Sequence, residues 1–239
     1  MCQECSGFSI ARRNLLKGGL ALGLAAPFMS SAYASDTAAA ASPRPQTASE
    51  ALQALADGNA RYVANAAINT DHSAGRTARS EGQQPFAAIV TCADSRVVPE
   101  LIFDQGPGDL FVVRVAGNFI NEDGLASLEY AAAVLGIKAI LVLGHSSCGA
   151  VSATIKSIHD NTLPPGHLPS LVNAIRPAVY DVMAENPADL LAAATAQNAR
   201  LNAQKAETTG PILSDFHTSG KIKSVAGVYE IATGKVAIL

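Results

Sequence analysis

Short, almost continuously apolar runs recur through the middle of the chain, and polar or turn-forming residues bound each of them. Such runs are typical of β-strands that are buried on both faces of a parallel sheet. Near the C-terminus two further runs flank an Ala-Thr-Gly turn, which predicts a terminal hairpin at the sheet edge. The predicted strands are residues 86–91, 110–115, 139–143, 223–231 and 235–239.

Between these runs, apolar residues recur at helical spacing. In the first such segment Leu52, Leu55 and Val63 share one face, and Ser49 is the expected N-cap. Residues 70–84 are polar and predict a loop. Strands that alternate with helices indicate an α/β fold, with a mostly parallel central sheet flanked by helices. We expect about four parallel strands plus one C-terminal antiparallel edge strand from the hairpin. The further helices are expected at residues 125–135, 150–159, 168–183 and 188–207.

The N-terminal segment has the order of an export signal. Arg12 and Arg13 precede an apolar stretch at residues 18–29, and Ala-Tyr-Ala at residues 32–34 offers small residues to a signal peptidase. The apolar stretch is shorter than the roughly 20 residues of a membrane span and contains Gly and Pro, which disfavours the alternative of an anchor. Residues 1–34 therefore predict a twin-arginine (Tat) signal that leads through the Tat translocon to a periplasmic or secreted location.

Composition limits the remaining function classes. Residues 35–46 are rich in Ala, Ser and Thr with two prolines and predict a flexible linker, which leaves residues 47–239 as a single domain. Without residues 1–34 the chain has 14 basic and 19 acidic residues and no basic stripe, so we expect no nucleic-acid partner. After signal removal we also expect no membrane association.

Cysteine usage points to a metal. Cys2 and Cys5 lie within the predicted signal, so only Cys92 and Cys148 stay with the domain. In an oxidising compartment two thiols usually pair. The Tat route exports proteins that are already folded, so a metal can be loaded onto the thiols first in the reducing cytoplasm.

The two cysteines lie in short polar clusters that each follow a predicted buried strand. Cys92 begins the run Cys-Ala-Asp-Ser-Arg, and His145 and Cys148 belong to the run His-Ser-Ser-Cys-Gly. Two thiolates and one imidazole suit zinc in tetrahedral geometry and leave one position for a further ligand. Sites in open α/β sheets gather at the carboxyl ends of strands, so the clusters converge if their strands are neighbours.

Asp94 has two possible roles. Its carboxylate could be the fourth metal ligand, which would close the site. It could instead pair with Arg96, because residues i and i+2 of an extended segment point to one side and a guanidinium grips a carboxylate at two points. Zinc would then keep an open position, at which it activates water.

At this point the chain resembles the beta class of carbonic anhydrases from about residue 51 to the C-terminus. The resemblance implies an α/β fold, one Zn²⁺ per chain, an obligate homodimer or homotetramer, and reversible hydration of carbon dioxide to bicarbonate and a proton. The matching motifs are Cys92-Ala93-Asp94-Ser95-Arg96, Phe111-Val112-Val113-Arg114, Glu129-Tyr130-Ala131 and Gly144-His145-Ser146-Ser147-Cys148-Gly149.

The resemblance also implies roles for individual residues. Cys92, His145 and Cys148 would bind zinc, and Asp94 with Arg96 would form the catalytic dyad. Gln83 would hydrogen-bond a substrate oxygen. The residues implied to line a narrow apolar substrate cleft, some of them across a dimer interface, are Phe111, Ala116 and Tyr130.

Some positions depart from the family pattern or allow other interpretations. Val134 stands where plant members have a His, so no proton shuttle is assigned, and a regulatory bicarbonate pocket that needs Trp is not expected because the chain has none. Arg114 and Glu129 lie in otherwise apolar elements; each could serve the site, but the favoured interpretation is a buried or intersubunit ion pair. Two alternative functions remain: hydrolysis of carbonyl sulfide or carbon disulfide at the same zinc site, and a non-catalytic zinc-binding or dithiol protein. Arg96 argues against the last, because a purely structural metal site needs no cation beside its ligands.

Overall fold

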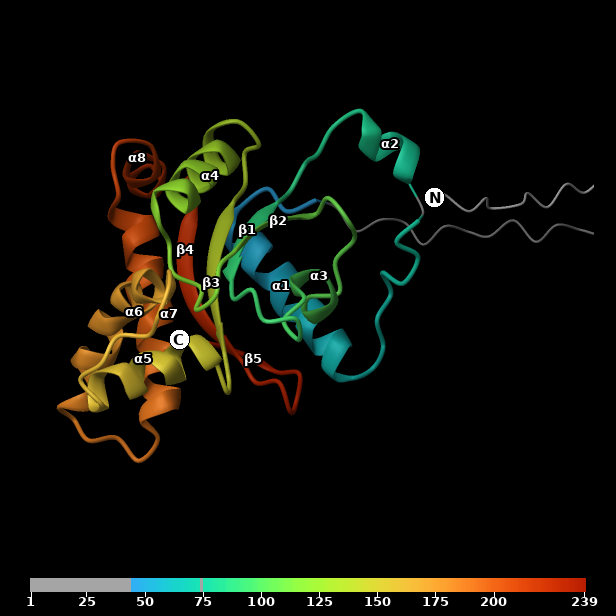
Figure 1. Ribbon diagram of the computed structural model, residues 1–239. Helices are drawn as coiled ribbons and strands as arrows, with labels where there is room; N and C mark the ends of the chain where they lie inside the picture. The colour runs from blue at the N-terminus through green and yellow to red at the C-terminus, as the bar shows by residue number, and fades with distance from the viewer. Residues whose placement is uncertain (1–43, 74) are drawn as a thin grey trace, which may run out of the picture. The chain divides into compact units, whose positions relative to one another are not determined.

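The computed structural model describes residues 44–73 and 75–239, which contain a five-stranded sheet of order β2-β1-β3-β4-β5 (Figure 1). The pairs β1–β2, β1–β3 and β3–β4 are parallel, and β5 runs antiparallel to β4. Four parallel strands and one antiparallel edge strand confirm the predicted architecture. The strands are β1 Ala87–Thr91, β2 Leu110–Arg114, β3 Ala139–His145, β4 Lys223–Tyr229 and β5 Val236–Ile238.

Helices cover both faces of this sheet. In Figure 1, α1 and α3 lie on one side, whereas α4, α6, α7 and α8 lie on the other. The sequence pattern missed α2, α3 and α8, because helices of four to seven residues are too short to show a helical period. The helices are α1 Ala48–Val63, α2 Arg76–Ser80, α3 Pro99–Ile102, α4 Glu122–Ala133, α5 Gly149–His159, α6 Leu168–Met183, α7 Leu190–Thr208 and α8 Ile212–Thr218.

The central strands are apolar throughout because both of their faces are covered. In β1, Ala88 and Val90 pack in the cluster beneath α4, α7 and α8, while Ile89 packs in the cluster beneath α1 and α3. Alternation of side chains along β3 divides its residues between the same two clusters. Every residue of β1 and β3 is buried, so these two strands form the rigid centre of the domain.

The first helix starts two residues earlier than the sequence pattern indicated. Thr47, not Ser49, is the N-cap: its side chain accepts a hydrogen bond from the Glu50 amide, and the Glu50 carboxylate accepts one from the Thr47 amide. This reciprocal capping box satisfies two backbone donors, which a cap at Ser49 would not do here.

The strand order places a topological switch between β1 and β3. From β1 the chain moves outward to β2 and then crosses back to β3 on the other side of β1. Loops that leave β1 and β3 therefore diverge at the carboxyl edge and open a crevice, which is where α/β sheets hold their ligands.

The predicted export signal at residues 1–34 and most of the predicted linker lie outside the described residues. Within the described ranges, no helix combines the length and apolar character that a membrane crossing requires.

Candidate metal centre and active site

The crevice between β1 and β3 contains three candidate metal ligands. Cys92 is the first residue after β1, His145 is the last residue of β3, and Cys148 is the N-cap of α5. All three side chains are buried, and their ligand atoms lie within 4.8 Å of one another. The convergence expected from two neighbouring strands is therefore present.

Backbone amides surround both sulfur atoms. The Gly117 amide donates to the Cys92 Sγ over 3.3 Å, and the amides at the start of α5 point at Cys148. The hydrogen bond between the two cysteines lowers the pKa of Cys92 and raises that of Cys148, so one thiolate is stabilised by the other thiol. Both cysteines are free rather than joined in a disulfide.

Gly117 was not recognised from the sequence, although a glycine soon after a strand end is a signal for close backbone approach. Its φ of +85° favours glycine, and a Cβ there would lie 2.4 Å from the Ile175 Cδ1 atom. Only glycine brings this amide to the Cys92 sulfur without a clash.

His145 is poised to bind through Nε2. Its Nδ1 lies 2.9 Å from the Ser146 carbonyl oxygen, whereas the buried Nε2 has no hydrogen-bond partner. An unpaired buried nitrogen is costly unless a ligand satisfies it. Zinc–ligand bonds of about 2.0–2.3 Å put tetrahedral ligand atoms roughly 3.5 Å apart, which the 4.8 Å limit accommodates. The donor set and the orphan nitrogen thus fit zinc.

Asp94 and Arg96 form the predicted pair beside this cluster. The Arg96 Nε donates to Asp94 Oδ1 over 3.0 Å, and its Nη2 donates to Oδ2 over 2.8 Å. These bonds hold the pKa of Asp94 far below its usual range. Oδ2 also lies 3.9 Å from His145 Nε2, so the carboxylate faces the metal ligands while it is engaged by Arg96. Direct ligation by Asp94 remains a prediction.

Arg114 holds the loop that carries this pair. Its Nε donates to the Cys92 carbonyl over 3.1 Å, and its Nη2 donates to the Asp94 carbonyl over 2.8 Å. Within the described residues no salt bridge joins Arg114 to a carboxylate, so the ion pair predicted from the sequence is not found in the single chain. Arg114 instead fixes the backbone on both sides of Ala93.

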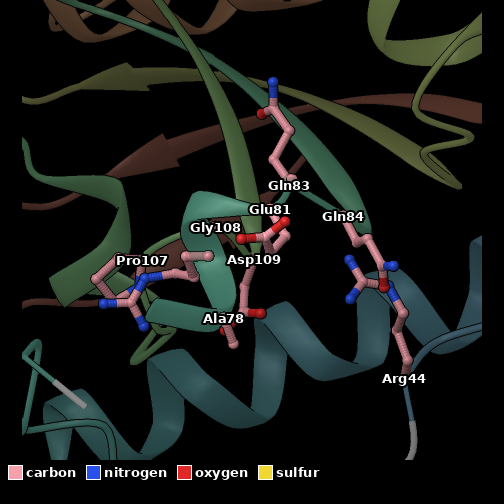
Figure 2. Close-up of a pocket in the computed structure, with 10 residues that line it drawn as sticks. Arg44, Ala78, Glu81, Gln83, Gln84, Pro107, Gly108 and Asp109 are labelled. Atoms are coloured by element: carbon pink, nitrogen blue, oxygen red, sulfur yellow. The ribbon is translucent and has the colours of Figure 1, made fainter. Parts of the chain in front are cut away.

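Gln83 lies before the amino end of β1, whereas Cys92 follows the carboxyl end of the same strand. Gln83 is exposed and lines a pocket of about 400 Å³ whose other residues include Arg44 and Asp109 but none of the metal ligands (Figure 2). The five residues of β1 lie between Gln83 and Cys92, and at about 3.3 Å per residue they span roughly 13 Å. Gln83 therefore does not reach the cluster of its own chain.

The three residues predicted to line the substrate cleft also differ in their distance from the metal cluster along the fold. Ala116 directly precedes Gly117, whose amide contacts the Cys92 Sγ, so it is the predicted cleft residue nearest in sequence to a contact with the cluster. Phe111 pairs with Ala88 near the start of β1, and Tyr130 is 48% exposed on α4. The single chain thus assembles the metal ligands, the Asp94–Arg96 pair and Ala116, but not Gln83, Phe111 or Tyr130.

Comparison with known proteins agrees with this geometry. Residues 87–236 match the family model described as carbonic anhydrase. The solved structure of the beta-carbonic anhydrase CcaA is 30% identical, covers 78% of this chain and 86% of its own, and superimposes with a TM-score of 0.61. The chain belongs to the beta-carbonic anhydrase family.

Other family members give the extent of the likeness. Carbonic anhydrase 2 of Mycobacterium tuberculosis is 50% identical over 133 residues, which are 54% of this chain and 63% of that relative. The chain thus aligns with less than two thirds of that relative's length. Tetrameric beta-carbonic anhydrases from Sordaria macrospora share the fold, with a TM-score of 0.63 at 21% identity over 77% of this chain and 93% of theirs.

Proposed function

We propose that this beta-carbonic anhydrase family member is a zinc-dependent carbonate dehydratase, which hydrates carbon dioxide reversibly to bicarbonate and a proton. The observation that carries the proposal is the Asp94 carboxylate, held by Arg96 and facing the unpaired Nε2 of His145 beside two buried cysteines. A purely structural metal site would not need an oriented anion and cation at this point.

Each residue has a defined task in this reaction. Cys92, His145 and Cys148 would hold zinc, which would supply the Lewis acidity that makes water nucleophilic near neutral pH. Asp94 stays anionic because Arg96 keeps its pKa low, so at neutral pH it serves as a hydrogen-bond acceptor that orients the nucleophile. Asp94 Oδ2 is the oxygen on the metal side, and Arg96 fixes its direction through two parallel hydrogen bonds.

We infer that the complete substrate cleft needs a second copy of the chain. The positions of Gln83, Phe111 and Tyr130 away from the cluster of their own chain support a role in the site of a partner copy. A homodimer would supply these residues, and a homotetramer would contain two such pairs. The tetrameric Sordaria enzymes give a precedent for the larger assembly.

Carbon dioxide hydration by the zinc-loaded protein tests the proposal, with metal content measured on the same samples. The wild type should be active with one zinc per chain. Cys148→Ser should lose zinc and activity together. Asp94→Ala should keep zinc and lose most turnover. Loss of zinc from Asp94→Ala would mean that the carboxylate is primarily a ligand, and a zinc-loaded wild type without hydration activity would overturn the proposed function.

We also propose export through the Tat pathway to the periplasm or the exterior. The support is the twin arginine at residues 12–13, the apolar stretch and the Ala-Tyr-Ala sequence that follows. Replacing both arginines by lysine should retain the protein in the cytoplasm, whereas export of the Lys-Lys variant at the wild-type level would contradict this route. Fractionation followed by mass measurement of the mature N-terminus gives the cleavage position.

A further inference from the structure

Ser146 makes three hydrogen bonds to the last residue of β4 and the two residues that follow it. The Ser146 amide donates to the Tyr229 carbonyl over 2.9 Å, continuing the pairing of β3 with β4. The Ser146 hydroxyl donates to Glu230 Oε1 over 2.8 Å and accepts from the Ile231 amide over 3.1 Å. Residues 83, 84 and 85 positions away in sequence thus hold Ser146 by its amide and its hydroxyl.

The Ser146 carbonyl in turn sets the state of His145. A carbonyl oxygen can only accept a hydrogen bond, so the 2.9 Å contact requires the proton of the imidazole to be on Nδ1. Nε2 is then left with its lone pair, and this is the buried nitrogen without a protein partner. The same contact also limits rotation of the ring, because the carbonyl belongs to Ser146, whose amide and hydroxyl are held by Tyr229, Glu230 and Ile231.

Glu230 is itself oriented before it meets Ser146. Its Oε1 accepts from the Ala232 amide over 3.2 Å, and its backbone amide donates to the Lys235 carbonyl over 2.8 Å. These bonds belong to the tight turn between β4 and β5, drawn in red in Figure 1. The carboxylate therefore arrives at the Ser146 hydroxyl from a structured turn rather than from a flexible chain.

We propose that Glu230 and Ser146 are positioning residues for the metal ligand His145. Glu230 holds the Ser146 side chain and so the position of this residue, and the Ser146 carbonyl fixes the tautomer and the ring orientation that zinc binding needs. This inference rests on the zinc site of the proposed function. Outer partners that orient a ligating histidine typically change metal affinity by about 10–100-fold when they are removed. Glu230 is exposed, so water competes for its hydrogen bond and the effect belongs at the lower end of that range.

Zinc affinity of the full-length protein tests this directly, by competition with a chelator of known zinc affinity. Glu230→Ala and Ser146→Ala should each raise the zinc dissociation constant about 10-fold. Glu230→Gln keeps a side-chain oxygen that can accept from the Ser146 hydroxyl, so it should stay within about 3-fold of the wild type. Glu185→Ala, at an exposed glutamate that follows α6, is the matched control and should leave zinc affinity unchanged.

Thermal unfolding of the zinc-free variants separates positioning from a merely structural role. If Glu230→Ala lowers only the melting temperature and keeps the wild-type zinc dissociation constant, the inference is overturned. The same holds if Glu230→Gln loses as much affinity as Glu230→Ala. A cobalt-substituted sample gives a second readout, because a misplaced imidazole should alter the visible absorption of the metal.

The two proposals fail in different ways. A wild type that binds zinc tightly but does not hydrate carbon dioxide refutes the function, while the affinity ratios of the variants still decide the positioning role. A wild type that is active, together with unchanged affinity in Glu230→Ala and Ser146→Ala, refutes the positioning role alone.

Discussion

Substitution of Gly117 by alanine should damage the metal centre through the backbone. Gly117 has a φ of +85°, and its amide donates to the Cys92 Sγ over 3.3 Å. A Cβ at this position would lie 2.4 Å from Ile175 Cδ1 and 3.1 Å from Ala150 Cβ. Ile175 is fully buried in packed surroundings, so its side chain has little room to turn away, and we expect the loop to shift and to take the amide with it.

The chain offers a matched control in Gly136, whose φ is +70° and whose added Cβ would have no atom within 4 Å. Alanine at either position carries the left-handed backbone strain of about 1–2 kcal/mol. Only Gly117→Ala adds overpacking, which costs about 1–3 kcal/mol more. Gly117→Ala should therefore lose about 2–5 kcal/mol of unfolding free energy against about 1–2 kcal/mol for Gly136→Ala.

Two measurements check this reasoning. Urea unfolding at one fixed protein concentration, with zinc held in excess, gives the difference in unfolding free energy between the two variants. Chelator competition gives zinc affinity, which should fall about 10-fold in Gly117→Ala and stay unchanged in Gly136→Ala. Equal destabilisation of the two variants would refute the overpacking argument, and a wild-type zinc affinity in Gly117→Ala would refute a role for this amide in metal binding.

Three further outcomes follow from the same contacts. Burial raises the pKa of the Asp104 carboxyl, but hydrogen bonds from Arg61 and from two backbone amides outweigh burial, so the net shift of this pKa is downward. The ionised Asp104 therefore stabilises the folded protein above the unfolded-state pKa of about 3.9, and this stabilisation is lost as pH falls through the lower folded-state pKa. Asp104→Asn should therefore lose about 2–3 kcal/mol at pH 7 in urea unfolding, and between about pH 5 and 3 its unfolding free energy should fall less steeply than that of the wild type; parallel pH curves would contradict this. Arg114→Ala frees the carbonyls of Cys92 and Asp94, so turnover should drop at least about 10-fold with zinc retained, and an unaltered turnover would argue against the loop-holding role. Removing zinc with a chelator should abolish hydration and lower the melting temperature, with both restored by added zinc; activity that persists in metal-free protein would exclude the zinc mechanism.

The sequence carried enough information for the sheet and for the three candidate metal ligands that the structure groups together. β1 and β3 are apolar at every position until polar residues end them, and that pattern alone indicates strands covered on both faces. Cys92 and His145 stand at the ends of those strands, and Cys148 follows His145 by three residues. Residue types that bind metals therefore occur where the sequence pattern predicts that strands end. Short helices such as α3, and the start of α1 at a Thr47 cap, depend on one or two hydrogen bonds that periodicity does not reveal.

The tertiary structure decided which groups act on those ligands. Strand order made β1 and β3 neighbours and opened the crevice between them. The fold also brought the Gly117 amide to a sulfur 25 positions away. Contacts of this kind join segments distant in the chain through backbone atoms, which are the same in every residue. Side-chain identity along the sequence therefore predicts the donors of the site, whereas only the folded chain determines the hydrogen bonds that orient them.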